Sequence, residues 1–133
     1  IMNNTASGNG SASVNGGGVF GLANGSGDNF LFAMNGGTIS GNTASSSVSA
    51  MGGGVDLSAF SGSVTFTMSG GTIYGNGAGA NSNTLSAPSK AGTSLSASSF
   101  AGTLTAKYGG TANQAIPLVS GSTDSTLTGK ISN

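Results

Sequence analysis

A nine-residue phrase occurs twice in this chain of 133 residues and constrains its fold more than any other feature. The stretch "MNGGTISGN" at residues 34–42 returns as "MSGGTIYGN" at residues 68–76. A related opening, "IMNNTA", begins the sequence, so that Ile1, Ile39 and Ile73 are spaced by 38 and 34 residues. A repeat of this length, built from short segments in a fixed order, indicates a solenoid in which each repeat forms one coil.

Each repeat contains three short segments with the features of β-strands. Apolar residues alternate with other residues before each Gly-Gly-Thr, as expected for a strand with one buried face. Glycine, asparagine and serine separate the segments. The pattern predicts an all-β fold, a β-solenoid of about three irregular coils plus a partial terminal coil. We expect one domain over residues 1–133, with coils at about 1–38, 39–72 and 73–111 and a terminal strand or cap at 112–133.

Stacking of equivalent residues predicts interior columns with a spacing of about 4.8 Å, the separation of paired strands. The expected columns are Ile1, Ile39 and Ile73; Val19, Val55 and Leu95; Met34, Met68 and Tyr108; and, beside the last, Phe32 and Phe66. Asn4, Asn42 and Asn76 each follow an isoleucine by three residues. Asparagine tolerates the left-handed backbone and its amide can bond to the next asparagine along a stack. An ordinary loop position would explain any one of them equally well, but three in register favour a ladder at one corner.

The repeats differ in length only between the residues of these columns, where a solenoid tolerates insertions. The first repeat has two extra residues in "GLANGSGDN", and "GNGAGANSNTLSAPSK" at residues 75–90 has no apolar periodicity. The sequence therefore predicts outward loops at residues 20–30 and 75–90.

The low charge of the chain excludes several classes of function. Charged residues make up 5% of the sequence and the net charge is zero, against about 25% charged residues in ordinary globular domains. Such a surface offers no electrostatic attraction for nucleic acid or anionic lipid. No apolar run of about 18 residues could insert into a membrane. A disordered linker would share this composition, but the repeats in register argue against one.

No residue is nominated as catalytic, cofactor-binding or metal-binding, and we expect no enzyme. Glycoside cleavage needs two carboxyl groups about 5 to 9 Å apart, whereas Asp28, Asp56 and Asp124 occupy non-equivalent positions in the repeats. The chain has no His or Cys to serve in nucleophilic catalysis. Asp56 lies between Val55 and Leu57 on an expected strand, so we expect its side chain to point outward and to be solvated.

The motifs "NGGTISGNTA" and "GGGV" resemble those of bacterial right-handed parallel β-helix surface proteins that repeat "FTMSGGTISGN…GGGV" in long arrays. The order and spacing are also similar to those of polymorphic outer-membrane-type adhesins and autotransporter passengers. The resemblance covers roughly residues 1–111. It implies a right-handed parallel β-helix at the cell surface or outside the cell, used in adhesion or as a structural stalk.

The ends of a solenoid expose strand edges and an apolar interior, which must be capped or will associate. The sequence begins on a ladder residue, Ile1, without charged residues nearby, so we expect either a segment of a longer array or an open coil that docks on another copy. We hypothesise an extracellular structural protein that forms a head-to-tail filament or surface fibre with itself. In this filament, residues 112–133 would meet residues 1–20 of the next subunit. The alternative is a β-helical adhesin segment whose loops bind a host or matrix ligand.

Overall fold

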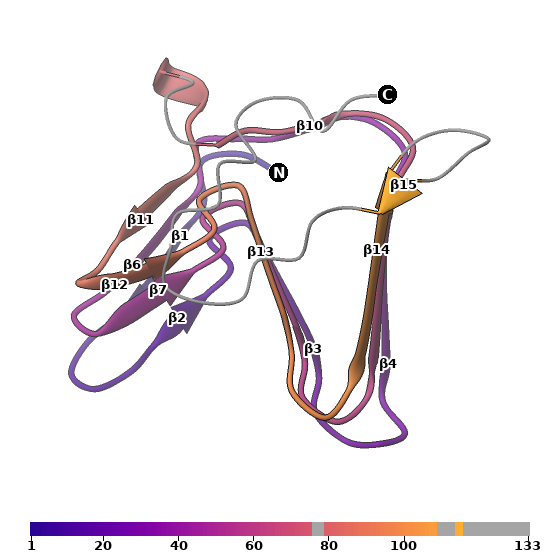
Figure 1. The fold of residues 1–133 in the computed structure, drawn as a ribbon. Helices are drawn as coiled ribbons and strands as arrows, with labels where there is room; N and C mark the ends of the chain where they lie inside the picture. Colours follow the sequence, from indigo (N-terminus) through magenta and orange to yellow (C-terminus); the bar gives the residue numbers. More distant parts are fainter. Residues whose placement is uncertain (76–78, 109–113, 116–133) are drawn as a thin grey trace.

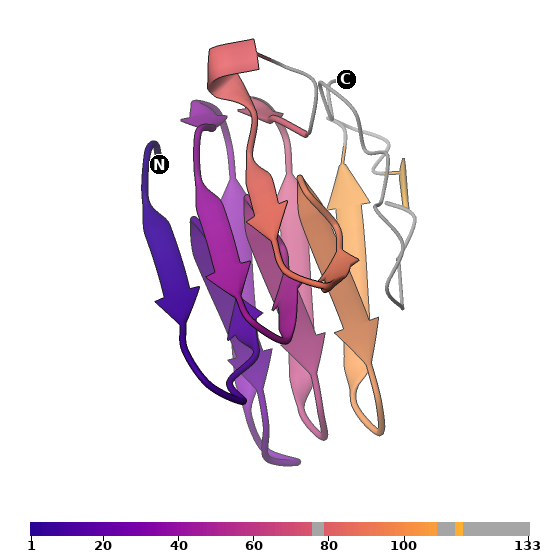
Figure 2. The same cartoon turned by 90° about the vertical axis from the view of Figure 1, so that its left-hand side faces the viewer.

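The protein is an all-β structure of parallel strands in stacked sheets, consistent with the β-solenoid that the repeats predict. The computed structural model describes residues 1–75, 79–108 and 114–115. Viewed along the stack, equivalent strands lie behind one another (Figure 1). In the perpendicular view they lie side by side, from the N-terminal strands at one end to β14 toward the other (Figure 2). Within the described ranges, no helix is long and apolar enough to span a membrane.

The chain passes repeatedly through the same set of positions. The first coil consists of β1 (Thr5–Gly8), β2 (Val14–Asn15), β3 (Val19–Ala23), β4 (Asn29–Met34) and β5 (Thr38–Ile39). The second coil consists of β6 (Thr43–Ser46), β7 (Ser49–Met51), β8 (Val55–Ala59), β9 (Ser63–Met68) and β10 (Thr72–Ile73). The third coil consists of β11 (Thr84–Ser86), β12 (Ser89–Ala91), β13 (Leu95–Ser99) and β14 (Thr103–Tyr108). A 3-10 turn, Gly79–Asn81, precedes β11, and β15 (Gln114–Ala115) pairs antiparallel with β14.

Equivalent strands of successive coils pair in parallel register. Five sheets result, with the orders β1-β6-β11, β2-β7-β12, β3-β8-β13, β4-β9-β14-β15 and β5-β10. Thr43 pairs with Thr5 on one side and with Thr84 on the other, offsets of 38 and 41 residues. Met68 pairs with Met34, an offset of only 34 residues. The additional residues of the third coil therefore lie between β10 and β11, around the 3-10 turn.

The local sequence explains both the strands and the corners. In β9, Val64, Phe66 and Met68 are buried and alternate with partly exposed Ser and Thr residues, which is the period-two pattern of a half-buried strand. The corner before β8 depends on Gly52, whose φ is 62°, a conformation that costs glycine little. A Cβ atom there would lie 2.3 Å from the carbonyl oxygen of Val55. The chain can therefore turn sharply from β7 into β8.

Two apolar clusters fill the stack. The larger cluster is contributed mainly by β3, β4 and their equivalents, with Phe66, Leu57 and Ile73 among its fully buried members. Phe66 stacks on Phe32 of the coil before it, with ring centroids 5.3 Å apart and an interplanar angle of 18°, a favourable arrangement for aromatic pairs. The smaller cluster contains Val14, Ala44, Ala50 and Leu85. Its members come from the β1-β6-β11 and β2-β7-β12 sheets and lie between them.

The prediction of an outward loop over residues 75–90 is wrong in its second half. Strands β11 and β12 lie in this segment, and Asn83 and Leu85 are buried. Leu85 aligns with Ala44 of the second coil, so the neighbouring coil stabilises a strand too short to show periodicity of its own. The loop predicted at residues 20–30 is also shorter than expected, because β3 extends to Ala23 and β4 begins at Asn29.

Candidate functional site

A ladder of asparagine side chains joins the coils at one corner. The Oδ1 atom of Asn42 accepts hydrogen bonds from the backbone N–H and the side-chain Nδ2 of Asn4, both at 3.0 Å. The Oδ1 atom of Asn83 accepts the same two bonds from Asn42, both at 2.9 Å. The amide of Asn42 also donates to the carbonyl oxygen of Ile1, and that of Asn83 to the carbonyl oxygen of Ile39. Asn42 and Asn83 are fully buried, so the bonds between them form away from water and fix the coil-to-coil register.

Asn83 occupies the place in this ladder that the spacing from the isoleucines predicts for Asn76, and Asn76 itself lies outside the described residues. A sequence signal for Asn83 exists in the phrase "NTAS" at residues 4–7 and 42–45, which returns as "NTLS" at residues 83–86. Alignment on the isoleucines conceals this signal. The segment from Ile73 to Asn83 is longer than the segment from Ile39 to Asn42, so a fixed offset from isoleucine selects the wrong asparagine.

The structure brings the other sequence-predicted columns together along the strand pairs. Val55 pairs with Val19 and with Leu95. In the sheet on the other side of the larger cluster, Met68 pairs with Met34 and with Tyr108, and Phe66 pairs with Phe32. Ile73 pairs with Ile39, and the bridge between Met2 and Ser40 places Ile1 next in that column.

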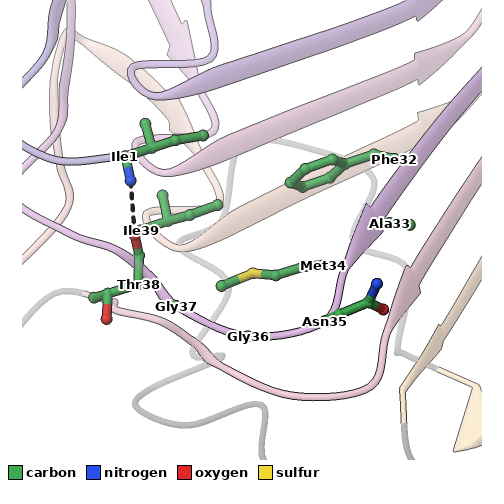
Figure 3. Close-up of a pocket in the computed structure, with 9 residues that line it drawn as sticks. All are labelled: Ile1, Phe32, Ala33, Met34, Asn35, Gly36, Gly37, Thr38 and Ile39. Carbon is green, nitrogen blue, oxygen red and sulfur yellow. Dashed lines mark hydrogen bonds between the residues drawn. The ribbon is translucent and has the colours of Figure 1, made fainter.

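The end face of the first coil is open within the described part of the chain. Ile1 has 52% of its surface exposed, whereas Ile39 and Ile73, below it in the same column, have 2% and 0%. A cavity of about 250 Å³ opens at this face, and its lining includes Ile1, Phe32, Met34 and Ile39 (Figure 3). The backbone nitrogen of Ile1 donates a hydrogen bond of 2.9 Å to the carbonyl oxygen of Thr38, beside the cavity (Figure 3). We refer to this surface as the first-coil face.

The first-coil face presents the same contact groups that each coil uses to bind its neighbour. In the second coil, a Cβ atom on Gly71 would lie 2.6 Å from the carbonyl oxygen of Gly37, so this bend packs directly on the coil before it. The equivalent bend of the first coil, Gly36 and Gly37, has no atom within 4 Å of either Cβ position. Among the described residues, Asn4 Oδ1 accepts no ladder bond, although the Oδ1 atoms of Asn42 and Asn83 each accept two. Gly36, Gly37 and the Asn4 amide oxygen therefore carry no coil contact of this kind among the described residues.

The prediction that Asp56 points into solvent is wrong. Val55 and Leu57 do face the larger cluster, and Asp56 faces the other side, but its exposed fraction is 0%. The backbone at the Gly52 corner covers this side of β8. A Cβ atom on Gly52 would lie only 2.5 Å from the Cβ atom of Asp56. Burial raises the pKa of Asp56 from 3.8 to about 6, because desolvation disfavours the charged carboxylate.

Nearby polar groups offset the desolvation of Asp56 only in part. The hydroxyl groups of Ser96 and Ser58 and the backbone N–H of Leu57 each lower the pKa of the carboxyl group. Neither carboxylate oxygen makes a hydrogen bond of good geometry with the described part of the chain. Asp56 is therefore a buried acid without a full set of partners, which is a cost to the folded state.

The described residues contain no cluster of three or more His, Cys, Asp or Glu side chains that could hold a metal ion. Asp28 instead closes the loop between β3 and β4, where its Oδ2 atom accepts hydrogen bonds from the backbone N–H groups of Asn24 and Gly25. The candidate functional site is thus a contact surface, the first-coil face. Compared with known proteins, the chain matches no family model, no curated protein and no solved structure.

Proposed function

We propose that the protein is an extracellular or cell-surface structural protein that assembles end to end through its first-coil face. The product would be a head-to-tail filament or surface fibre. The only partner required is another copy of the chain, without cofactor, metal or nucleic acid, and we propose no catalytic role.

The observation that carries this proposal is the open first-coil face. An apolar cavity of about 250 Å³, the half-exposed Ile1 and the acceptor Asn4 Oδ1 lie on one coil end. Unpaired strand edges with apolar neighbours favour association with further strands. A contact between two different surfaces of identical subunits produces a filament when successive subunits stack along one axis and the contact does not close into a ring. The absence of net charge removes long-range repulsion between subunits.

The finer description of the fold belongs to the same proposal. We infer a right-handed parallel β-helix of about three irregular coils with a partial terminal coil, in a single domain over residues 1–133. The resemblance of "NGGTISGNTA" and "GGGV" to bacterial β-helix surface proteins supports this description and the location at the cell surface. In the proposed filament, residues 112–133 of one subunit contact residues 1–20 of the next.

Sedimentation velocity over a wide concentration range tests the proposed assembly. Ile1→Lys places a charge on the first-coil face and should shift the wild-type distribution of large species to the monomer. Val48→Lys is the matched control, because Val48 is similarly exposed, at 43%, but lies on the turn between β6 and β7. If wild type and Ile1→Lys assemble to the same extent, the first-coil face is not the contact through which subunits assemble.

A second candidate function is the binding of a host or matrix ligand, as in an adhesin. The supporting observation is an exposed aromatic pair at the corners after β8 and β13. Phe60 and Phe100 are 49% and 71% exposed, and their ring centroids lie 5.1 Å apart. Exposed aromatic side chains are enriched at binding surfaces. Binding to immobilised matrix proteins that disappears in a Phe60→Ser/Phe100→Ser variant, with unfolding unchanged, would favour this function over assembly.

A further inference from the structure

The far side of the third coil differs from the far sides of the first two coils at one corner. The first coil has Gly17 and Gly18 immediately before β3, and the second coil has Gly53 and Gly54 immediately before β8. Leu95 pairs with Val55, so the equivalent residues in the third coil are Thr93 and Ser94. Two glycines are thus replaced by residues with side chains.

The glycines at this corner touch the backbone of the following coil. A Cβ atom on Gly17 would lie 2.3 Å from the carbonyl oxygen of Gly53 in the second coil. A Cβ atom on Gly53 would lie 2.5 Å from the carbonyl oxygen of Thr93 in the third coil. Both distances are far shorter than the optimal separation of non-bonded heavy atoms, roughly 3.5–4.0 Å. Glycine is therefore required wherever another coil stacks on this side.

The second glycine of each pair meets the asparagine ladder. A Cβ atom on Gly54 would lie 2.7 Å from the Nδ2 atom of Asn83 and 2.6 Å from the carbonyl oxygen of Ser94. The same atom on Gly18 would lie 3.0 Å from Asn42 Nδ2. A side chain at this position would thus displace the amide that fixes the register of the next coil.

In the third coil, both positions carry the side chains that this geometry forbids. Thr93 and Ser94 are 6% and 0% exposed, so other atoms of the chain already cover them. By equivalence with Gly53 and Gly54, their Cβ atoms point to where the backbone of an equivalent following coil would lie. The Ser94 hydroxyl is buried without a hydrogen-bond partner in the described part of the chain. A complete fourth coil with the same corner therefore cannot stack on the third in the way that the third stacks on the second, whereas a partial coil without this corner is not obstructed.

The opposite end of the stack has no such obstruction. Gly36 and Gly37 on the first-coil face have no atom within 4 Å of their Cβ positions.

We propose that Thr93 and Ser94 terminate coil stacking on the far side of the third coil. The first-coil face fits a coil with a glycine pair at the Gly53 and Gly54 positions, and it does not fit the third coil of a second copy in the same register. This inference rests on the coil geometry and not on the proposed function. It narrows that function, because a head-to-tail filament would need a contact other than direct stacking of the third coil on the first.

Insertion of the same extra coil at two places tests the termination. A second copy of residues 35–68 supplies one coil with the Gly52-Gly53-Gly54 corner. Inserted after Met34, it lies between two glycine coils and should add to the stack. The urea m-value scales with the surface exposed on unfolding, so it should rise by roughly a quarter to a third. Inserted after Tyr108, the same segment should leave the m-value at the wild-type level.

A companion variant keeps the test decisive. Thr93→Gly/Ser94→Gly removes the obstruction, and in this background the insertion after Tyr108 should raise the m-value as the insertion after Met34 does. The proposal is overturned if the insertion after Tyr108 raises the m-value while Thr93 and Ser94 are present. It is equally overturned if this insertion leaves the m-value unchanged in the Thr93→Gly/Ser94→Gly background. Dilute monomer suffices for these measurements, so their outcome is independent of whether the wild-type protein forms filaments.

Discussion

Replacement of Asp56 by Asn should stabilise the protein at neutral pH and remove part of its pH dependence. Asp56 is fully buried, and its pKa in the folded protein is about 6 rather than 3.8. Below pH 3.8 the carboxyl group is protonated in both the folded and the unfolded chain, so burial carries no ionisation cost. Between pH 3.8 and 6 the unfolded chain releases the proton while the folded chain retains it, so stability falls as pH rises.

The magnitude of this effect follows from the two pKa values. One pKa unit corresponds to about 1.4 kcal/mol, so the rise from 3.8 to about 6 lowers the free energy of unfolding by about 3 kcal/mol above pH 6. Asn has nearly the same shape and no charge. The Asp56→Asn variant should therefore be more stable than wild type by up to about 3 kcal/mol at pH 8, and the difference should vanish near pH 3.

Urea unfolding at several pH values between 3 and 8, followed by far-UV circular dichroism, measures this difference. The chain has no Trp for fluorescence. Asp28→Asn is the control: Asp28 is exposed and accepts two loop hydrogen bonds, so its replacement should give no gain at pH 8. A difference between Asp56→Asn and wild type that is absent at pH 8, or equal at all pH values, would refute the account of a desolvated carboxylate.

Three further substitutions test the stacking geometry. Asn42→Ala removes the central member of the ladder and leaves buried partners unpaired, so it should lower the free energy of unfolding by roughly 3 kcal/mol, whereas Asn9→Ala, at an exposed position, should have little effect in the same urea titration. Gly53→Ala should lower the free energy of unfolding by about 1–3 kcal/mol through overpacking, because its Cβ would meet the backbone of the third coil. Gly27→Ala is the control, since no atom lies within 4 Å of that Cβ position. Equal thermal midpoints for the two variants would contradict the packing of Gly53 against the third coil. Phe66→Ala should cost about 3–5 kcal/mol, clearly more than Phe32→Ala, because Phe66 is covered by coils on both sides while Phe32 borders the open first-coil face. Similar losses for the two phenylalanines would argue against an open end.

The sequence was informative wherever one side chain had to repeat at one place in every coil. Val19, Val55 and Leu95 follow the recurrent corner, and Phe32 and Phe66 follow the strand alternation, so a fixed offset within the repeat locates both columns. Strands pair at constant register along such columns, and parallel stacking follows from this repetition. The loop between β3 and β4 was likewise marked by its two additional residues.

Other features were hidden because they depend on contacts between segments. The third ladder position is Asn83, since the chain between β10 and β11 is longer than its equivalent and displaces the count from Ile73. The two-residue alternation assigned Asp56 to the correct side of β8 but gave no information on whether another segment covers that side. Replacement of glycines by Thr93 and Ser94 reads as simple degeneration of a motif until the position of the neighbouring backbone is known.

Electron microscopy of the negatively stained full chain, at several protein concentrations, tests the central claim most directly. The open first-coil face predicts long filaments of uniform width that shorten on dilution and are lost in the Ile1→Lys variant. Compact single particles at every concentration, with the protein folded, would contradict end-to-end assembly and would direct attention to Phe60 and Phe100 as a binding surface.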